Sequence, residues 1–178
     1  GSLGVLAVLL VAAVFGMYFY LVAFPKMYRE LPFDERRSIG TLDIRDPGSE
    51  NPTWTRWREA QGKMYASRKM QVRLNVRKLA EGDGYSSVRL GALANFEADS
   101  FWEVDASDSG IGDDGLRDLA ALSGVRHLDL RNADIRGSGF VLFLPETMVE
   151  TLDISGNPFE SEWLPWVAQF ETLEMLDI

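Results

Sequence analysis

Four aspartates recur at a fixed step of 24 residues in the C-terminal half of the chain: Asp105, Asp129, Asp153 and Asp177. Each lies between two apolar residues, an alternation typical of a strand with one buried and one exposed face. The four carboxylates are therefore expected on one exposed face, with neighbours about 5 Å apart. Like charges at that spacing repel each other, and a basic partner segment or a cation would relieve the repulsion. The alternative interpretation is that the four carboxylates are simply solvated.

The single histidine of the chain, His127, lies two residues before Asp129. A histidine beside a carboxylate can act as a general base, but no serine or cysteine nucleophile pattern accompanies this pair. The chain also has no cysteine, which excludes disulfides, zinc–thiolate sites and cysteine nucleophiles. We therefore expect no catalytic residues, and we predict that the protein is not an enzyme.

A glycine-rich acidic segment, D-S-G-I-G-D-D-G over residues 108–115, has the composition of a calcium loop. It lacks the spacing and the terminal glutamate of an EF-hand, so capping of the following helix by Asp113 or Asp114 is the better interpretation. No phosphate-binding loop, dinucleotide fingerprint or zinc spacing occurs elsewhere in the chain. We expect neither a metal nor a cofactor.

Apolar residues repeat with the same step of 24 residues as the aspartates. Each unit combines a short alternating strand, a turn, an apolar anchor and a return segment with helical spacing, such as residues 115–122 and 162–170. One such unit cannot bury its own apolar face, so the units must stack. The repeating columns are Phe101, Val125, Val149 and Leu173; Ile111, Ile135 and Phe159; Leu116, Phe140 and Leu164; and Leu119, Phe143 and Val167.

These repeats resemble the leucine-rich repeat family over residues 100–178. The match is to the pattern L-x-x-L-x-L-x-x-N and is clearest over residues 149–157. The resemblance implies parallel strands lining a concave face that binds partner proteins. Two features depart from the family: the asparagine column holds Ser109, Ala133 and Asn157, and the sequence stops at Ile178 within a strand, as an incomplete repeat domain would.

Two partner-binding surfaces follow from this interpretation. Trp163 and Trp166 flank Pro165 on a return segment, and we expect one indole to pack in the core and the other to anchor a partner. The concave face is expected to present the outward-facing residues of the strands and the turns that follow them. These residues are Asp105, His127, Asp129, Arg131, Thr151, Asp153 and Asp177.

Residues 3–24 contain no charged side chain and are long enough, as a helix, to cross a bilayer core of about 30 Å. Tyr18 and Tyr20 lie near the end of this run, and Lys26 and Arg29 follow it, as at a membrane interface. We predict a transmembrane helix over 1–24 in preference to a signal peptide or a buried helix. The basic residues after it place the repeat domain in the cytoplasm.

Residues 25–90 form a basic linker, although the net charge of the whole chain is -9. Prolines and glycines indicate loops, and Thr53 is positioned to cap an amphipathic helix over 54–70. Trp54 and Trp57 lie on its apolar face, which would either cap the repeats or lie at the membrane surface. Alternation over 71–79 predicts a strand.

The sequence as a whole predicts an α/β fold: a single transmembrane helix, then a short leucine-rich-repeat solenoid with a parallel sheet over 91–178. We expect a single-pass, membrane-anchored protein–protein interaction module, an accessory subunit that stabilises a larger membrane complex of respiratory or photosynthetic type. The alternative is a receptor-like protein that recognises a ligand on its concave face. The expected partners are the lipid bilayer and other protein subunits, with no nucleic acid, which the acidic balance disfavours, and no small-molecule substrate.

Overall fold

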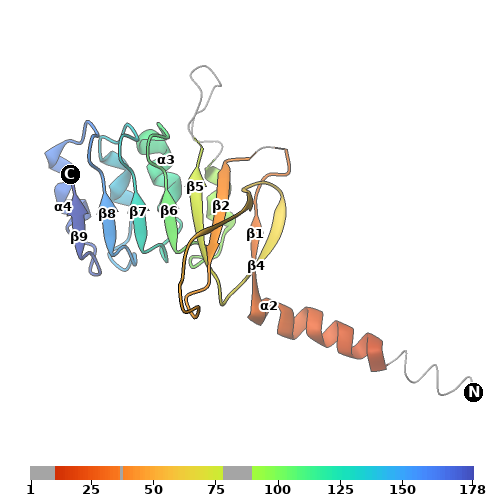
Figure 1. Ribbon diagram of the computed structural model, residues 1–178. Coiled ribbons are helices and arrows are strands. Elements are labelled where there is room, and N and C mark those ends of the chain that lie inside the picture. The colour runs from red at the N-terminus through yellow and green to blue at the C-terminus, as the bar shows by residue number, and fades with distance from the viewer. Residues whose placement is uncertain (1–10, 37, 78–89) are drawn as a thin grey trace, which may run out of the picture.

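The computed structural model describes residues 11–36, 38–77 and 90–178. A helix comes first, α-helical over 11–18, π-helical over η1 (Phe19–Ala23) and α-helical again over α2 (Phe24–Met27). Its side chains are mostly exposed, and it extends away from the sheets (Figure 1). The ring of Phe24 stacks on Tyr28 and meets Tyr65 edge-on, with centroids 4.8 and 5.0 Å away. These aromatic contacts fasten the end of the helix to the first sheet.

The strands form two sheets. β1 (Tyr28–Pro32) pairs antiparallel with β4 (Lys63–Ser67) in a two-stranded sheet. The second sheet has seven strands in the order β3-β2-β5-β6-β7-β8-β9. β2 (Gly40–Arg45) pairs antiparallel with β3 (Thr55–Glu59) and with β5 (Gln71–Val76). β5 to β9 are parallel, the last four being β6 (Glu103–Asp105), β7 (His127–Asp129), β8 (Thr151–Asp153) and β9 (Met175–Asp177).

The step of 24 residues appears directly in the register of the parallel strands. Val104 pairs with Leu128, Leu128 with Leu152, and Leu152 with Leu176. Between the strands, the chain returns through short helical segments on one side of the sheet (Figure 1). These segments are η2 (Gly91–Asn95), α3 (Gly112–Leu119), η3 (Ser138–Leu142), η4 (Ser161–Trp163) and α4 (Leu164–Val167).

The core lies between the parallel strands and the return segments. The repeating apolar columns supply it, because strand residues such as Leu128 and Leu152 are buried against return-segment residues such as Leu116 and Phe140. The one asparagine of the expected column, Asn157, stabilises the turn beside this core. Its Oδ1 accepts from the backbone N–H groups of residues 133 and 135 at 2.9 Å, and its Nδ2 donates to the carbonyls of residues 130 and 154 at 2.7 and 2.8 Å.

The predicted fold class, a transmembrane helix followed by a leucine-rich-repeat solenoid, is wrong. The described residues form an α/β fold with a mixed seven-stranded sheet and a separate two-stranded antiparallel sheet. β6 does not begin an independent stack, because it pairs with β5, which in turn pairs antiparallel with β2. The repeats therefore extend a sheet that residues 40–76 have already begun.

The transmembrane prediction over 3–24 begins outside the described residues, which start at residue 11. Within the described ranges, no helix combines the length and the apolar character that a bilayer crossing requires. The helix there changes to π-helical hydrogen bonding at Phe19 and ends at Met27, where the chain enters β1. For these residues the predicted single-pass helix is wrong, and so is the localisation built on it, with a cytoplasmic repeat domain.

Strands replace the amphipathic helix predicted over 54–70. β3 and β4 occupy this segment, joined by a turn in which Gly62 has a φ of 72°. Met64 and Ala66 are buried while their neighbours are more exposed, which is the two-residue period of a strand. The aromatic and β-branched residues here favour that conformation. The strand predicted over 71–79 is confirmed for Gln71–Val76, where β5 alternates between half-buried and buried residues.

Candidate functional site

The face of the parallel strands that points away from the return segments carries two columns of polar side chains. The register aligns Arg73, Glu103, His127, Thr151 and Met175 in one column. It aligns Asn75, Asp105, Asp129, Asp153 and Asp177 in the other. A shallow cavity of about 420 Å³ lies over both columns, with Arg45 of β2 at its edge. The structure thus brings together the sequence-predicted residues of β7, β8 and β9.

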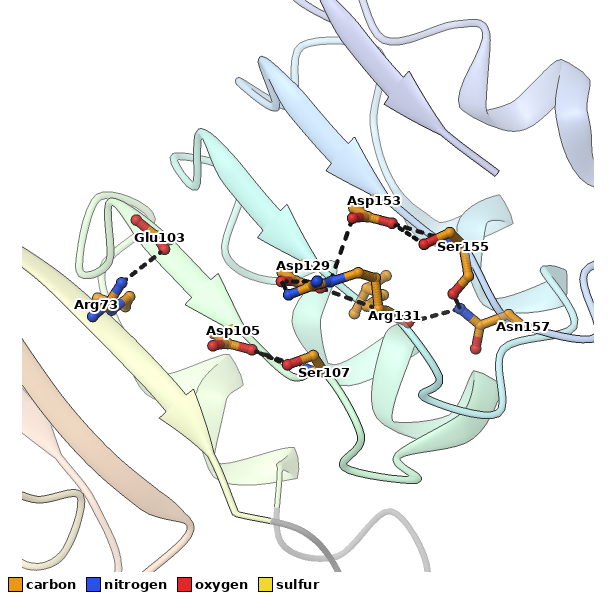
Figure 2. A network of polar contacts seen from close by, with 10 residues as sticks. Arg73, Glu103, Asp105, Ser107, Asp129, Arg131, Asp153, Ser155 and Asn157 are labelled. Atoms are coloured by element: carbon orange, nitrogen blue, oxygen red, sulfur yellow. Dashed lines mark hydrogen bonds and ion pairs between the residues drawn. The ribbon is translucent and has the colours of Figure 1, made fainter.

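Arg131 neutralises the middle of the aspartate column. Its Nη2 lies 2.6 Å from Oδ2 of Asp129, and its Nε lies 3.4 Å from Oδ2 of Asp153 (Figure 2). The hydrogen bond to Asp129 and the charges of the nearby aspartates raise the pKa of Arg131 above its ordinary value. Since Arg131 is about half exposed, a competing cation can reach the same carboxylates from solvent.

The aspartates also hold the turns that follow their strands. Oδ1 of Asp105 accepts from the backbone N–H and the hydroxyl of Ser107, at 3.0 and 2.6 Å. Asp153 makes the same pair of contacts with Ser155, at 3.0 and 2.7 Å (Figure 2). Asp129 accepts from the backbone N–H of Arg131 at 3.1 Å. The column therefore has a local structural role besides any binding role.

His127 does not form a pair with Asp129. Its Nδ1 lies 2.8 Å from Oγ1 of Thr151, its neighbour across the strands, and its ring centroid lies 6.0 Å from that of Trp102. Among the residues that the structure describes, no group of three or more His, Asp or Glu side chains is placed to hold a metal ion. The imidazole therefore contacts its cross-strand neighbour and not the aspartate column.

A second arginine bridge, which the sequence interpretation missed, lies at the other end of the same face. Nη2 of Arg73 lies 2.7 Å from Asp43 of β2, and Nη1 lies 3.3 Å from Glu103 of β6 (Figure 2 shows the second contact). Burial opposes ionisation of Asp43, but the hydrogen bond from Arg73 and the charges of Arg73 and Arg56 outweigh it and hold the pKa of Asp43 below its usual value. The sequence signal that could have placed Arg73 on this face was its alternation with the buried residues of the predicted strand, which Asn75 shares.

Asp113 does not cap its own helix as predicted. α3 begins without a side-chain cap, and the Asp113 carboxylate instead accepts four hydrogen bonds from the start of the next return segment, η3. Oδ1 accepts from the backbone N–H groups of Arg136 and Gly137, at 3.1 and 2.9 Å. Oδ2 accepts from the N–H and the hydroxyl of Ser138, at 3.1 and 2.7 Å. The acidic segment over 108–115 thus links neighbouring repeats.

The two tryptophans of the predicted aromatic patch differ in exposure. Trp163 is partly buried and packs beside Gly137, where any added Cβ would meet the indole. Trp166 is 41% exposed on α4. The indole of Trp166 is therefore the one that remains accessible to a partner.

The residues predicted to mark a membrane interface are scattered. Tyr18, Tyr20 and Lys26 lie exposed on the N-terminal helix. Arg29 is buried in β1, and Trp57 packs against the core from β3. Trp54 lies between the guanidinium groups of Arg45 and Arg73, at 4.5 and 4.9 Å. The β-structure around Arg29 and Trp57 turns their side chains inward, and the interface role stays a prediction.

Comparisons of the chain with protein-family models, with curated proteins and with solved structures gave no match.

Proposed function

We propose that the chain is a protein–protein interaction module that binds an extended basic segment of a partner protein on the exposed face of β6 to β9. The observation that carries this proposal is the position of Arg131, whose guanidinium lies between the carboxylates of Asp129 and Asp153. This contact within the chain is of the same kind as the contact that an arginine of the partner would make.

The next pair of carboxylates in the column repeats this geometry without an internal guanidinium. Asp153 pairs in register with Asp177, as Asp129 pairs with Asp153. Among the described residues, Asp177 makes no ion pair. An arginine from a partner can therefore lie between Asp153 and Asp177 as Arg131 lies one strand earlier, with bidentate geometry that favours guanidinium over ammonium.

The column of His127, Thr151 and Met175 offers the partner both polar and apolar contacts. His127 and Thr151 offer hydrogen-bonding groups, and Met175 is 63% exposed beside them in the same cavity. The acidic surface also steers a basic segment towards the face at low ionic strength.

The test is calorimetric titration with a ten-residue peptide of alternating arginine and serine, run at low and at high salt. We expect saturable binding that weakens with salt, and a loss of about tenfold in affinity in the double variant Asp153→Asn, Asp177→Asn. The matched control is Glu171→Gln, Glu174→Gln, two exposed glutamates that precede β9 and lie outside the cavity. Equal losses in both double variants would show that only net charge attracts the peptide and would overturn the proposal.

The accessory-subunit role in a larger assembly stays a prediction. The same applies to the alternative, a receptor-like protein that uses this face for a free ligand. Stoichiometric recovery of a partner through the wild-type face, lost in the Asp153→Asn, Asp177→Asn variant, favours the first. Recovery of the chain alone, with a small basic ligand on the same face, favours the second.

A further inference from the structure

A second cavity, of about 320 Å³, lies at the edge of the sheet where the parallel strands begin. Segments far apart in the sequence meet there: β1, the turn between β4 and β5, and the loops that lead into β6 and β7. The aspartate turns lie at the opposite ends of these strands. The lining residues that carry the argument are Arg29, Arg68, Lys69, Asp99, Trp102 and Arg126.

The lining of this cavity contains four cationic side chains and the single carboxylate of Asp99. Arg68 lies 2.5 Å from Glu97 and 3.5 Å from Asp99, so part of its charge is compensated. Arg126 pairs with Glu150. Lys69 makes no ion pair with any residue that the structure describes. The balance around the cavity therefore favours an anion.

Arg29 supplies the most unusual charge, because its side chain is buried and held by neutral groups. The residue is 6% exposed, and its guanidinium donates to the backbone carbonyls of Asp99, at 2.6 Å, and of Met70. Its Nε is buried without an acceptor, and no carboxylate within the described ranges forms an ion pair with it. Burial lowers the pKa of Arg29, and the charge of Asp99 offsets this only in part. A buried charge without a counterion is costly, and an anion beside it reduces that cost.

Trp102 gives the cavity an aromatic wall. The guanidinium of Arg126 lies over its ring, 4.8 Å from the centroid, and its indole Nε1 is buried with no acceptor among the described residues. Two donors without acceptors, on Arg29 and Trp102, thus lie in the wall of one cationic cavity. Because both residues line the cavity, an oxyanion bound there is expected to change the surroundings of both donors.

We propose that this cavity binds a multiply charged oxyanion, such as the phosphate group of a small molecule. Lys69, Arg68 and Arg126 contact the anion, and the buried charge of Arg29 stabilises it from behind. Because a water molecule takes up about 30 Å³ of liquid volume, the cavity has room for a phosphate group and part of the molecule that carries it. Trp102 then contacts that remaining part.

The probe is pyrophosphate, titrated into the full chain at constant ionic strength set with sodium chloride, with acetate as a singly charged comparison. The signals are the NMR resonances of the Trp102 indole N–H and the Arg29 Nε–H, together with the thermal unfolding midpoint. We expect saturable shifts of both resonances and a raised midpoint with pyrophosphate, and much weaker binding of acetate. A linear response that sodium chloride reproduces would overturn the proposal.

The variant Lys69→Gln removes a cation that holds no other group in place, so its fold should be preserved. We expect at least a fivefold loss of pyrophosphate affinity. The matched control is Lys63→Gln, an exposed lysine on the neighbouring strand β4 whose loss changes the net charge equally. Equal losses in both variants would contradict the site. This anion test and the basic-peptide test use probes of opposite charge, so failure of one proposal leaves the other standing.

Discussion

The two halves of the seven-stranded sheet contain the same kind of ion-pair bridge in different surroundings. In each half, an arginine on the exposed face lies between two carboxylates from different elements. Arg73 joins β2 to β6, and the three side chains of that bridge are between 10 and 23% exposed. Arg131 lies between β7 and β8, with 51% of its side chain exposed. The difference indicates that the first bridge stabilises the fold, whereas the second is accessible from solvent, as the proposed exchange with a partner requires.

The sharpest test of this difference is Arg73→Met. It leaves Glu103 without its cation and the buried carboxylate of Asp43 with Arg56 alone, and we expect a loss of about 3 kcal/mol in the free energy of unfolding. Urea denaturation at pH 7 measures it. The matched variant is Arg131→Met, which should lose less because its partners, Asp129 and Asp153, are 25 and 31% exposed and water can reach them. Equal losses would remove the distinction between the halves.

Asn157→Ala tests where the stability of the parallel half lies. The amide makes hydrogen bonds to five backbone groups, so we expect its loss to cost about 2 kcal/mol in the free energy of unfolding. Ser155→Ala, in the same turn, removes one hydroxyl contact with Asp153 and serves as the control. If the two variants lose the same amount, the turns beside the core are not what stabilises this half.

Asp43 of β2, in the antiparallel half of the sheet, should make the free energy of unfolding depend on pH in the acid range. Because the pKa of Asp43 is lower in the folded chain than in the unfolded one, its contribution to stability is fully present above the unfolded value of about 4. That contribution is lost as the pH falls through the folded pKa. Asp43→Asn should therefore give a flatter dependence of unfolding free energy on pH below about 4. Asp134→Asn, in an exposed turn, provides the comparison, and an unchanged slope in Asp43→Asn would contradict the assignment.

The smallest expected effect concerns binding. Arg131→Gln removes the internal competitor for Asp129 and Asp153, so the alternating arginine–serine peptide should bind a few-fold more tightly at low salt. Calorimetry at two salt concentrations measures the change. Weaker binding in this variant would mean that Arg131 organises the face for its partner instead of competing with it.

Parts of this arrangement could be predicted from sequence and parts could not. The step of 24 residues predicts the register of β6 to β9, because residues at equivalent positions of successive repeats pair with each other across the strands. The alternation of apolar residues over 71–79 likewise predicted β5. Over 54–70, however, the tryptophans Trp54 and Trp57 have helical spacing, and only the sheet shows that Met64 and Ala66 alternate as strand residues. The bridge of Arg73 depends on a strand order that brings β2 beside β5, which no local pattern encodes.

The same limit applies to the apolar N-terminal run and to the second cavity. Hydropathy alone could not show that the helix ends at Met27 and continues as a strand of a sheet. The cationic cavity is assembled from β1 and from loops that lie far apart in the sequence, as the contact from Arg29 to Asp99, 70 residues later, illustrates. Trp102 and Arg126 share the 24-residue step of the repeats, but Arg29, Arg68 and Lys69 do not, so only the fold makes all of them neighbours.

The carboxylate of Asp113 has a consequence for the order in which this half of the molecule forms. It accepts the leading N–H groups of η3, which belong to the following repeat. The later segment therefore gains its cap only after the earlier one has reached its native position. We therefore expect folding of the parallel half to propagate from β5 towards β9, and native-state hydrogen exchange that shows the lowest protection in β9 would support this order.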